Sequence, residues 1–95
     1  MESRVEIRHL RAFVAVVEAG SFSAGARSLN VSQPALSQNV SMLEQSLDRR
    51  LLDRSPGGVS PTPAGIALFS EARSLIRRFE KALAVMAGTN LLLRN

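Results

Sequence analysis

The chain has 95 residues, 45% of them hydrophobic, which is enough for one small domain with a modest core and an extension. It contains no cysteine and one histidine, so it offers neither a disulfide framework nor the ligand set of a zinc site, and no cofactor is predicted for this chain. A net charge of +4 and a pI near 11.4 favour polyanionic partners.

No apolar run approaches the roughly 20 residues of a membrane span, and the first ten residues, MESRVEIRHL, lack the apolar core of a signal peptide. The sequence therefore predicts a cytoplasmic protein without a membrane partner.

The first helix is predicted over about residues 7–19. Its apolar residues recur at helical spacing, namely Ile7, Leu10, Phe13, Val14 and Val17. Gly20 ends this helix. His9 lies in it beside two arginines and is expected to be an ordinary, partly exposed side chain. Without a base and an orienting partner near a nucleophile, the chain is predicted not to be an enzyme.

Two shorter helices are predicted next, over about residues 22–29 and 33–47. Ser21 and Ser32 each precede an apolar-periodic stretch and offer an N-cap hydroxyl. Pro34 stands in the first turn of the second of these helices, where a missing N–H costs nothing.

The residues around the junction have the spacing of a helix-turn-helix over about residues 22–41. Ala26 is the small residue at which the second helix crosses the first, and Asn30 tolerates the left-handed backbone that the corner needs. Leu29 and Val31 bracket the turn and are expected to bury it. This pattern predicts a second helix that docks in the DNA major groove.

That second helix has an apolar and a polar face. The apolar face consists of Leu36, Val40, Leu43 and Leu47. The outer face consists of Gln33, Pro34, Ser37, Gln38, Ser41 and Gln45. It is uncharged as far as Glu44, and its Gln and Ser side chains both donate and accept hydrogen bonds, as the reading of base edges requires. An ordinary solvated face is the alternative, and the place of this helix in the motif favours base reading.

A two-stranded hairpin is predicted over about residues 51–61. Leu51 and Leu52 precede a Pro56-Gly57-Gly58 turn, and Pro followed by Gly fits the centre of a tight reversal with positive φ at Gly57. A hairpin that follows three helices is the wing of a winged helix-turn-helix.

Five arginines near the wing and the helices are candidates to contact phosphate, namely Arg8, Arg27, Arg49, Arg50 and Arg54. For Arg54 the sequence is equally compatible with a purely structural ion pair to Asp48 or Asp53.

A long helix is predicted over residues 63–90, with Thr62 as its N-cap and Pro63 at its start. Apolar residues step by three and four along it in a coiled-coil seam of Phe69, Ala72, Ile76, Phe79, Leu83 and Met86. Leu68 and Leu75 are expected to pack on the preceding body, which leaves the seam for a second molecule. A helix that only covers its own domain is the alternative, but a length of ~40 Å overhangs so small a body.

The seam also suggests a register. In an antiparallel pair centred between Arg77 and Arg78, the facing residues are Phe69 with Met86, Ala72 with Leu83, and Ile76 with Phe79. The fold class predicted is therefore mostly α, a winged helix-turn-helix of three helices and a two-stranded wing, followed by a linker helix that forms an antiparallel coiled-coil dimer.

Four segments together carry a resemblance to a known family, and these are LRAFVAVVEAGSFSAGARSL, VSQPALSQNVSMLE, LLDRS and TPAG. In this order and spacing they resemble the N-terminal DNA-binding region of a LysR-type transcriptional regulator, over about residues 7–86. The resemblance implies regulation of transcription by sequence-specific binding of an interrupted palindrome in promoter DNA. It divides the chain into a DNA-binding domain at 5–62 and a linker and dimerisation helix at 63–90. Full-length members carry a C-terminal domain that binds a small-molecule effector, and they commonly form tetramers; that domain is absent here, and the tail TNLLLRN favours a fragment.

Position by position, the resemblance places Gln33, Pro34 and Ser37 in the major groove. It places Ser21, Ser23 and Ser32 near phosphates. We expect Gln38 and Ser41 to join the base contacts, although Gln38 stands where similar members often have arginine, which favours adenine over guanine there. Gly57 and Gly58 stand where a basic residue often enters the minor groove, so Arg54 is the remaining candidate for this role.

A winged-helix scaffold for protein interaction and dimerisation, without specific DNA binding, is the competing interpretation. Its support is the apolar seam and the mostly uncharged third helix. Such a scaffold would have only weak affinity for polyanions, whereas a regulator binds DNA selectively and with a strong salt dependence.

Overall fold

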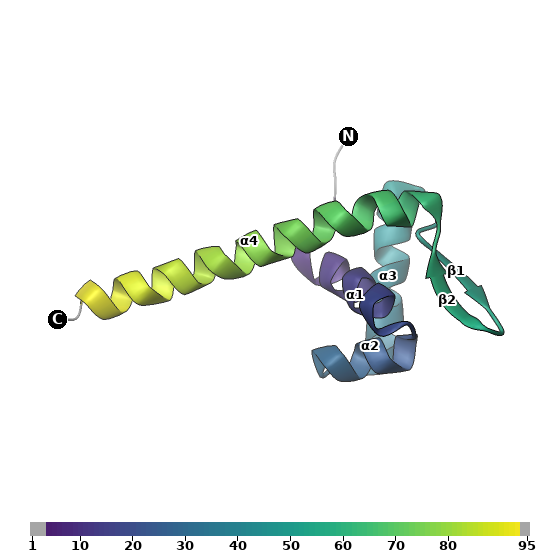
Figure 1. Ribbon diagram of the computed structural model, residues 1–95, viewed down its shortest axis with the longest axis horizontal. Helices are drawn as coiled ribbons and strands as arrows, with labels where there is room; N and C mark the ends of the chain where they lie inside the picture. Colours follow the sequence, from purple (N-terminus) through teal and green to yellow (C-terminus); the bar gives the residue numbers. More distant parts are fainter. Residues whose placement is uncertain (1–3, 94–95) are drawn as a thin grey trace.

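The computed structural model describes residues 4–93, with side chains described as far as Gly88. It contains four helices and one antiparallel hairpin (Figure 1). In chain order the elements are α1 (Ile7–Ala19), α2 (Phe22–Leu29), α3 (Gln33–Leu47), β1 (Leu52–Ser55), β2 (Gly58–Pro61) and α4 (Pro63–Leu93). The predicted bounds of the first three helices are confirmed. The tail at 89–95 lies outside the described side chains, although α4 continues to Leu93 rather than ending near 90.

The predicted helix caps are confirmed by hydrogen bonds. The Ser21 hydroxyl accepts from the Ala24 N–H at 3.1 Å, and the Ser32 hydroxyl accepts from the Ala35 N–H at 3.2 Å. These bonds satisfy N–H groups that have no partner inside a helix. Asn30 takes the left-handed conformation, with φ 57°, and ends α2. The tight corner between α2 and α3 therefore forms from local interactions.

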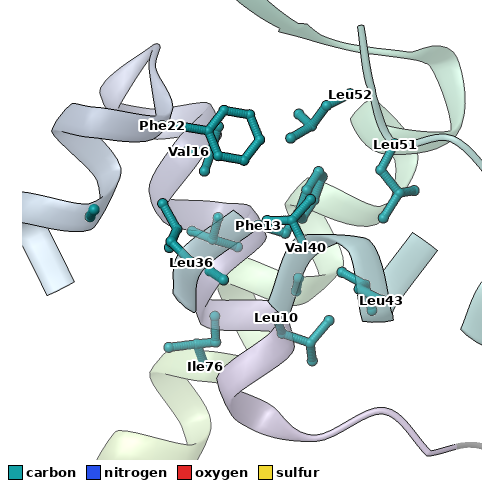
Figure 2. Close-up of a cluster of buried hydrophobic side chains, with 14 residues drawn as sticks. Leu10, Phe13, Val16, Phe22, Leu36, Val40, Leu43, Leu51, Leu52 and Ile76 are labelled. Atoms are coloured by element: carbon teal, nitrogen blue, oxygen red, sulfur yellow. The ribbon is translucent and has the colours of Figure 1, made fainter. Parts of the chain in front are cut away.

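The core lies where α1 packs against the other three helices (Figure 2). Phe13 at its centre has no exposed surface, and Ala26 in α2 is 4% exposed, as the helix crossing requires. The prediction for Val31 was wrong, because its side chain is 44% exposed. Leu29 alone covers the corner from the core side. The turn between α2 and α3 has three residues, and the side chain of Val31 at its centre points to solvent.

His9 also differs from its prediction, because its side chain is fully buried rather than partly exposed. Its Nδ1 atom accepts a hydrogen bond from the Glu6 N–H at 3.0 Å, so the imidazole caps the start of α1. Nε2 has no hydrogen-bond partner among the residues that the structure describes. The ring thus belongs to the N-terminal cap of α1 and to the core, four residues before Phe13 on the same helix face.

The wing is a four-residue ladder in which Leu52 pairs with Pro61 and Ser55 with Gly58. Leu51 and Leu52 are buried at its base. The predicted positive φ at Gly57 was wrong: the positive value, 132°, is at Gly58, one residue later. The tight turn keeps its two central residues at negative φ, and the chain regains the strand direction through the following glycine.

Helix α4 begins against the base of the wing. The Thr62 hydroxyl accepts from the Gly65 N–H at 3.0 Å, which confirms the predicted cap. A Cβ atom at Gly65 would overlap the carbonyl oxygen of Leu51, so only glycine allows this approach. Two ion pairs, Arg11–Glu80 at 3.1 Å and Arg73–Glu18 at 3.2 Å, join α4 to α1 further along.

The face of α4 that covers its own domain differs from the prediction. Ala72 and Ile76 were expected to face a partner, but they are 2% and 9% exposed and pack into the core of this chain. Leu75 was expected to pack inward but is 51% exposed. The heptad pattern shows which residues share a face and does not show whose surface that face meets. The predicted register through Ala72 and Ile76 is therefore wrong.

Beyond the contacts of Phe79 and Glu80 with Arg11 of α1, α4 extends as a rod away from the domain (Figure 1). Every side chain from Arg77 to Gly88 is exposed, including those of Phe79, Leu83 and Met86. Within the described residues, none of the helices combines the length and the apolar character needed to cross a membrane.

Candidate nucleic-acid interface

Helix α3 presents the face that the sequence predicts for base contacts. Leu36, Val40 and Leu43 have no exposed surface and hold one side of the helix against α1. The opposite side is open: Gln33, Pro34 and Gln38 are exposed, whereas Ser37 and Ser41 are half-buried. These five predicted base-contact residues lie on successive turns of one rigid helix. Such a face can offer several donors and acceptors to a groove at fixed spacing.

The outer face is free of acidic charge for a reason that the sequence alone did not reveal. Glu44 turns toward the loop before the wing, where its Oε2 accepts from the Leu51 N–H at 2.7 Å and the Leu52 N–H at 3.3 Å. This carboxylate therefore acts as an anchor between α3 and β1. Sequence reasoning missed the role, because no local signal links residues seven and eight positions apart across a turn.

The predicted backbone-contact serines lie at the starts of the two helices of the motif. Ser21 and Ser32 use their hydroxyl oxygens to accept from backbone N–H groups, which leaves each O–H able to donate outward. Ser23 is exposed in the first turn of α2. The three hydroxyls thus stand beside the N-termini of α2 and α3, where the helix dipole favours anions.

Of the predicted arginines, Arg8 makes an exposed ion pair with Glu6 at 3.5 Å, and the other four occupy three different environments. Arg27 and Arg49 are exposed, and no ion pair within residues 4–88 engages either of them. Arg50 makes a long ion pair with Asp53, at 3.7 Å, and donates to the Leu52 carbonyl at 3.3 Å. Because both side chains of this ion pair are largely exposed, it stabilises the fold little.

Arg54 has neither of the ion pairs that the sequence allowed. Its guanidinium carbon lies 4.2 Å from the centroid of the Phe22 ring, at the start of α2. Asp53 pairs with Arg50 instead, and Asp48 ends α3 in the left-handed conformation. Arg54 is therefore a cation at the junction of wing and helix-turn-helix. Phe22 is also a buried residue of the core.

The tip of the wing is small and uncharged. A Cβ atom at Gly58 would meet nothing within 4 Å, so the space around the tip is open. Arg54, two residues before Pro56, is the cation of the strand that leads to this tip.

Comparison with known proteins agrees with this geometry. The model of the bacterial regulatory helix-turn-helix proteins of the lysR family matches residues 7–66. The chain is 40% identical over 90 residues to the nitrogen assimilation regulatory protein nac of Klebsiella aerogenes, an alignment that covers 95% of this chain and 30% of that protein. It is 46% identical over 71 residues to the SDS degradation transcriptional activation protein of Pseudomonas sp. (strain ATCC 19151), with coverage of 75% and 23%.

Solved structures show the same arrangement. A C206 mutant of Corynebacterium glutamicum OxyR has a TM-score of 0.90 at 38% identity, covering 95% of this chain and 29% of that one. The DNA-binding domain of BenM, solved in complex with catB site 1 DNA, has a TM-score of 0.83 at 37% identity, with coverage of 88% and 94%. The chain thus spans less than a third of the curated relatives and nearly all of the BenM domain. It belongs to the LysR family of bacterial regulatory helix-turn-helix proteins.

Proposed function

We propose that this chain binds double-stranded promoter DNA sequence-specifically and thereby regulates transcription. The observation that carries the proposal is the outer face of α3, whose uncharged hydrogen-bonding side chains stand opposite three fully buried leucine and valine residues. A helix held this firmly can bring its side chains to base edges without much loss of conformational freedom. The complex of the BenM domain with DNA supports the same use of this fold.

In this proposal, the contacts divide into two groups. Gln33, Pro34, Ser37, Gln38 and Ser41 meet base edges in the major groove. Ser21, Ser23, Arg27, Ser32, Arg49, Arg50 and Arg54 meet the sugar-phosphate backbone. The first group sets which sequence is bound, and the second supplies the salt-dependent part of the affinity.

We further propose that two copies pair through a stripe of α4 that is exposed from Leu75 onward and half-buried against its own domain at Leu68. The interface would be the α4 stripe, defined as Leu68, Leu75, Phe79, Ala82 and Met86, whose steps of seven, four, three and four follow a coiled-coil seam. Leu75 and Met86 are 51% and 60% exposed. At 100° per residue, this stripe lies about 70° round the helix from the buried residues Ala72 and Ile76. A partner can therefore pack beside the domain without displacing it.

Four of the five stripe residues match in an antiparallel pair centred on Arg77, whereas Ala82 falls opposite Ala72, which is buried in its own domain. Leu75 then faces Phe79 of the second copy, and Leu68 faces Met86 at each end. Because the helix extends beyond the domain on one side only, this arrangement places the two DNA-binding domains at opposite ends of the pair (Figure 1). Such a separation suits two half-sites of an interrupted palindrome.

Disulfide formation tests this register, because the chain has no cysteine of its own. Chains carrying Leu75→Cys are mixed with chains carrying Phe79→Cys and oxidised, and a disulfide between the two kinds of chain is expected. Ile66→Cys, which lies on the opposite side of α4, is the matched control and should not crosslink. Faster crosslinking of Phe79→Cys chains with one another than with Leu75→Cys chains would favour parallel pairing.

For the whole protein, we propose a regulator in which a further domain binds a small-molecule effector and the dimers assemble into tetramers in the cytoplasm. The support is the family and the length of the relatives, of which this chain matches about 30%. The DNA-binding part described above requires neither a metal nor a cofactor for the contacts proposed.

Selection of bound duplexes from a random DNA pool at about 150 mM salt, followed by sequencing, tests the proposed function. Recovery of an inverted repeat is expected. Binding without sequence enrichment, with equal affinity for any polyanion, would contradict sequence-specific recognition and favour the scaffold interpretation.

A further inference from the structure

The wing and the helix-turn-helix meet at a cation and an aromatic ring. Arg54 comes from β1 and Phe22 is the first residue of α2, and their separation of 4.2 Å from guanidinium carbon to ring centroid is the shortest of the three such contacts described. The ring itself belongs to the core: Phe22 is 8% exposed and lies at the edge of the buried cluster toward Leu52 (Figure 2). The core thus holds the Phe22 ring in place, and the Arg54 guanidinium lies over the face of this ring.

Arg54 keeps its hydrogen-bonding capacity in this position. Attraction to the face of a ring uses the charge of the guanidinium and not its five N–H donors. No hydrogen bond or ion pair from Arg54 to another side chain occurs within residues 4–88. Its donors are therefore available for an anion outside the domain.

The position of Arg54 beside the start of α2 indicates which kind of anion its donors would meet. Phe22 follows Ser21, the cap of α2, and precedes the exposed Ser23, both of which are proposed to lie beside phosphates. On the wing side, the tip residues Gly57 and Gly58 carry no charge. Arg54 is thus the cation that the wing holds closest to the start of α2, whereas Arg50 of the preceding loop is directed to Asp53 and the Leu52 carbonyl.

We propose that Phe22 is a positioning residue for DNA binding: its ring holds the Arg54 guanidinium at the start of α2, so that Arg54 meets the DNA backbone at a fixed place relative to the recognition helix. This rests on the proposed function. A free arginine side chain must be immobilised when it binds phosphate, whereas one already held by a ring loses less conformational entropy. Phe22 would therefore raise DNA affinity without touching DNA.

A double-mutant cycle on duplex binding tests the inference. Arg54→Ala is expected to weaken binding about tenfold on every sequence and to reduce the salt slope by about one, as the loss of one phosphate contact predicts. Phe22→Leu keeps an apolar side chain in the core but removes the aromatic face, and it should weaken binding about threefold to fivefold. In the Arg54→Ala background, Phe22→Leu should have no further effect.

Two controls separate positioning from stability. Phe13→Leu makes the same change at a fully buried ring that no arginine contacts, so it should lower the melting temperature and leave affinity unchanged at a temperature where the chain is folded. Arg54→Lys keeps the charge but offers fewer donors, and it should restore the salt slope with only part of the affinity.

Two results would overturn the inference. Equal losses from Phe22→Leu in the presence and absence of Arg54 would mean that the ring acts through the fold. An unchanged affinity and salt slope in Arg54→Ala would mean that this arginine meets no phosphate. Both are distinct from failure of the proposed function, in which the unaltered chain itself would show no selective binding of duplex DNA.

Discussion

Gln33 occupies the first position of α3, directly after the Ser32 cap, and its side chain is exposed. The N-terminal residues of a recognition helix are those that reach base edges. Neighbouring Pro34 has no N–H, so it leaves no unpaired backbone donor in the first turn of α3. At the scale of residues, the proposed function thus depends on exposed side chains that α3 positions and that contribute nothing to the core.

Gln33→Ala should therefore weaken binding to the selected sequence by about 1–3 kcal/mol and relax the preference at one base, as expected for loss of a bidentate base contact. Titration of the cognate duplex and of a random duplex would measure both effects. Gln45→Ala, an exposed glutamine near the other end of α3, is the matched control and should bind normally. Equal losses on cognate and random DNA would show that Gln33 contacts the backbone.

Gly65 is a residue on which the position of a whole helix depends. Because a Cβ atom would overlap the Leu51 carbonyl oxygen, Gly65→Ala should lower the free energy of unfolding by about 1–3 kcal/mol. Gly88→Ala makes the same change in the same helix where a Cβ meets nothing, and it should leave stability unchanged or raise it slightly. Urea denaturation followed by circular dichroism measures both, and equal stabilities would contradict the close approach.

At the scale of elements, α3 and the wing are joined by the Glu44 carboxylate, which accepts from two consecutive backbone N–H groups at the base of β1. A further hydrogen bond, from the Thr62 N–H to the Leu51 carbonyl at 3.0 Å, joins the same base to the start of α4. Three elements thus meet at Leu51, which is 1% exposed. The relative orientation of α3, the wing and α4 therefore depends on these hydrogen bonds, which are made beside a buried leucine.

Glu44→Ala should lower the free energy of unfolding by about 2–3 kcal/mol, since it leaves two partly buried donors without their charged acceptor. Glu71→Ala is the matched control: this carboxylate is exposed on α4, and its removal should change stability by less than about 0.5 kcal/mol. Urea denaturation measures the difference. A similar small change for both variants would mean that the loop satisfies its donors in another way.

At the scale of the whole molecule, the principal extents of 56 × 33 × 21 Å reflect one helix that is much longer than the domain it covers. Its 31 residues correspond to about 46 Å at the usual rise. The first half completes the core, and the described side chains of the second half, up to Gly88, are exposed, with Leu83, Val85 and Met86 among them. The proposed dimer would cover part of this exposed apolar surface.

Leu75→Lys should convert the dimer to a monomer and weaken binding of the full palindrome at least tenfold, because each domain then binds its half-site alone. Binding of an isolated half-site should change little. Ile66→Lys alters an equally exposed residue on the opposite side of α4, at 61% exposure, and should preserve the dimer. Sedimentation and duplex titration are the measurements, and an unaltered dimer in Leu75→Lys would exclude the α4 stripe as the interface.

The sequence by itself determined the elements and the ends of the first three helices. Helix periodicity, the serine and threonine caps and Asn30 at the corner act over no more than about four residues, so their effects can be inferred from neighbouring letters. For the same reason, the outer face of α3 and the residues proposed to contact bases on it can be predicted from the sequence alone. The family followed from the order of these local signals.

Only the tertiary structure decided which surfaces meet. It showed that α4 covers its own domain with Ala72 and Ile76, that Glu44 binds the base of the wing, and that Arg54 lies on Phe22. It also buried His9 and exposed Val31. Each of these outcomes depends on groups that are far apart in sequence and that compete for the same apolar surface or polar partner. The packing of the whole domain, rather than any local pattern, determines which of these contacts form.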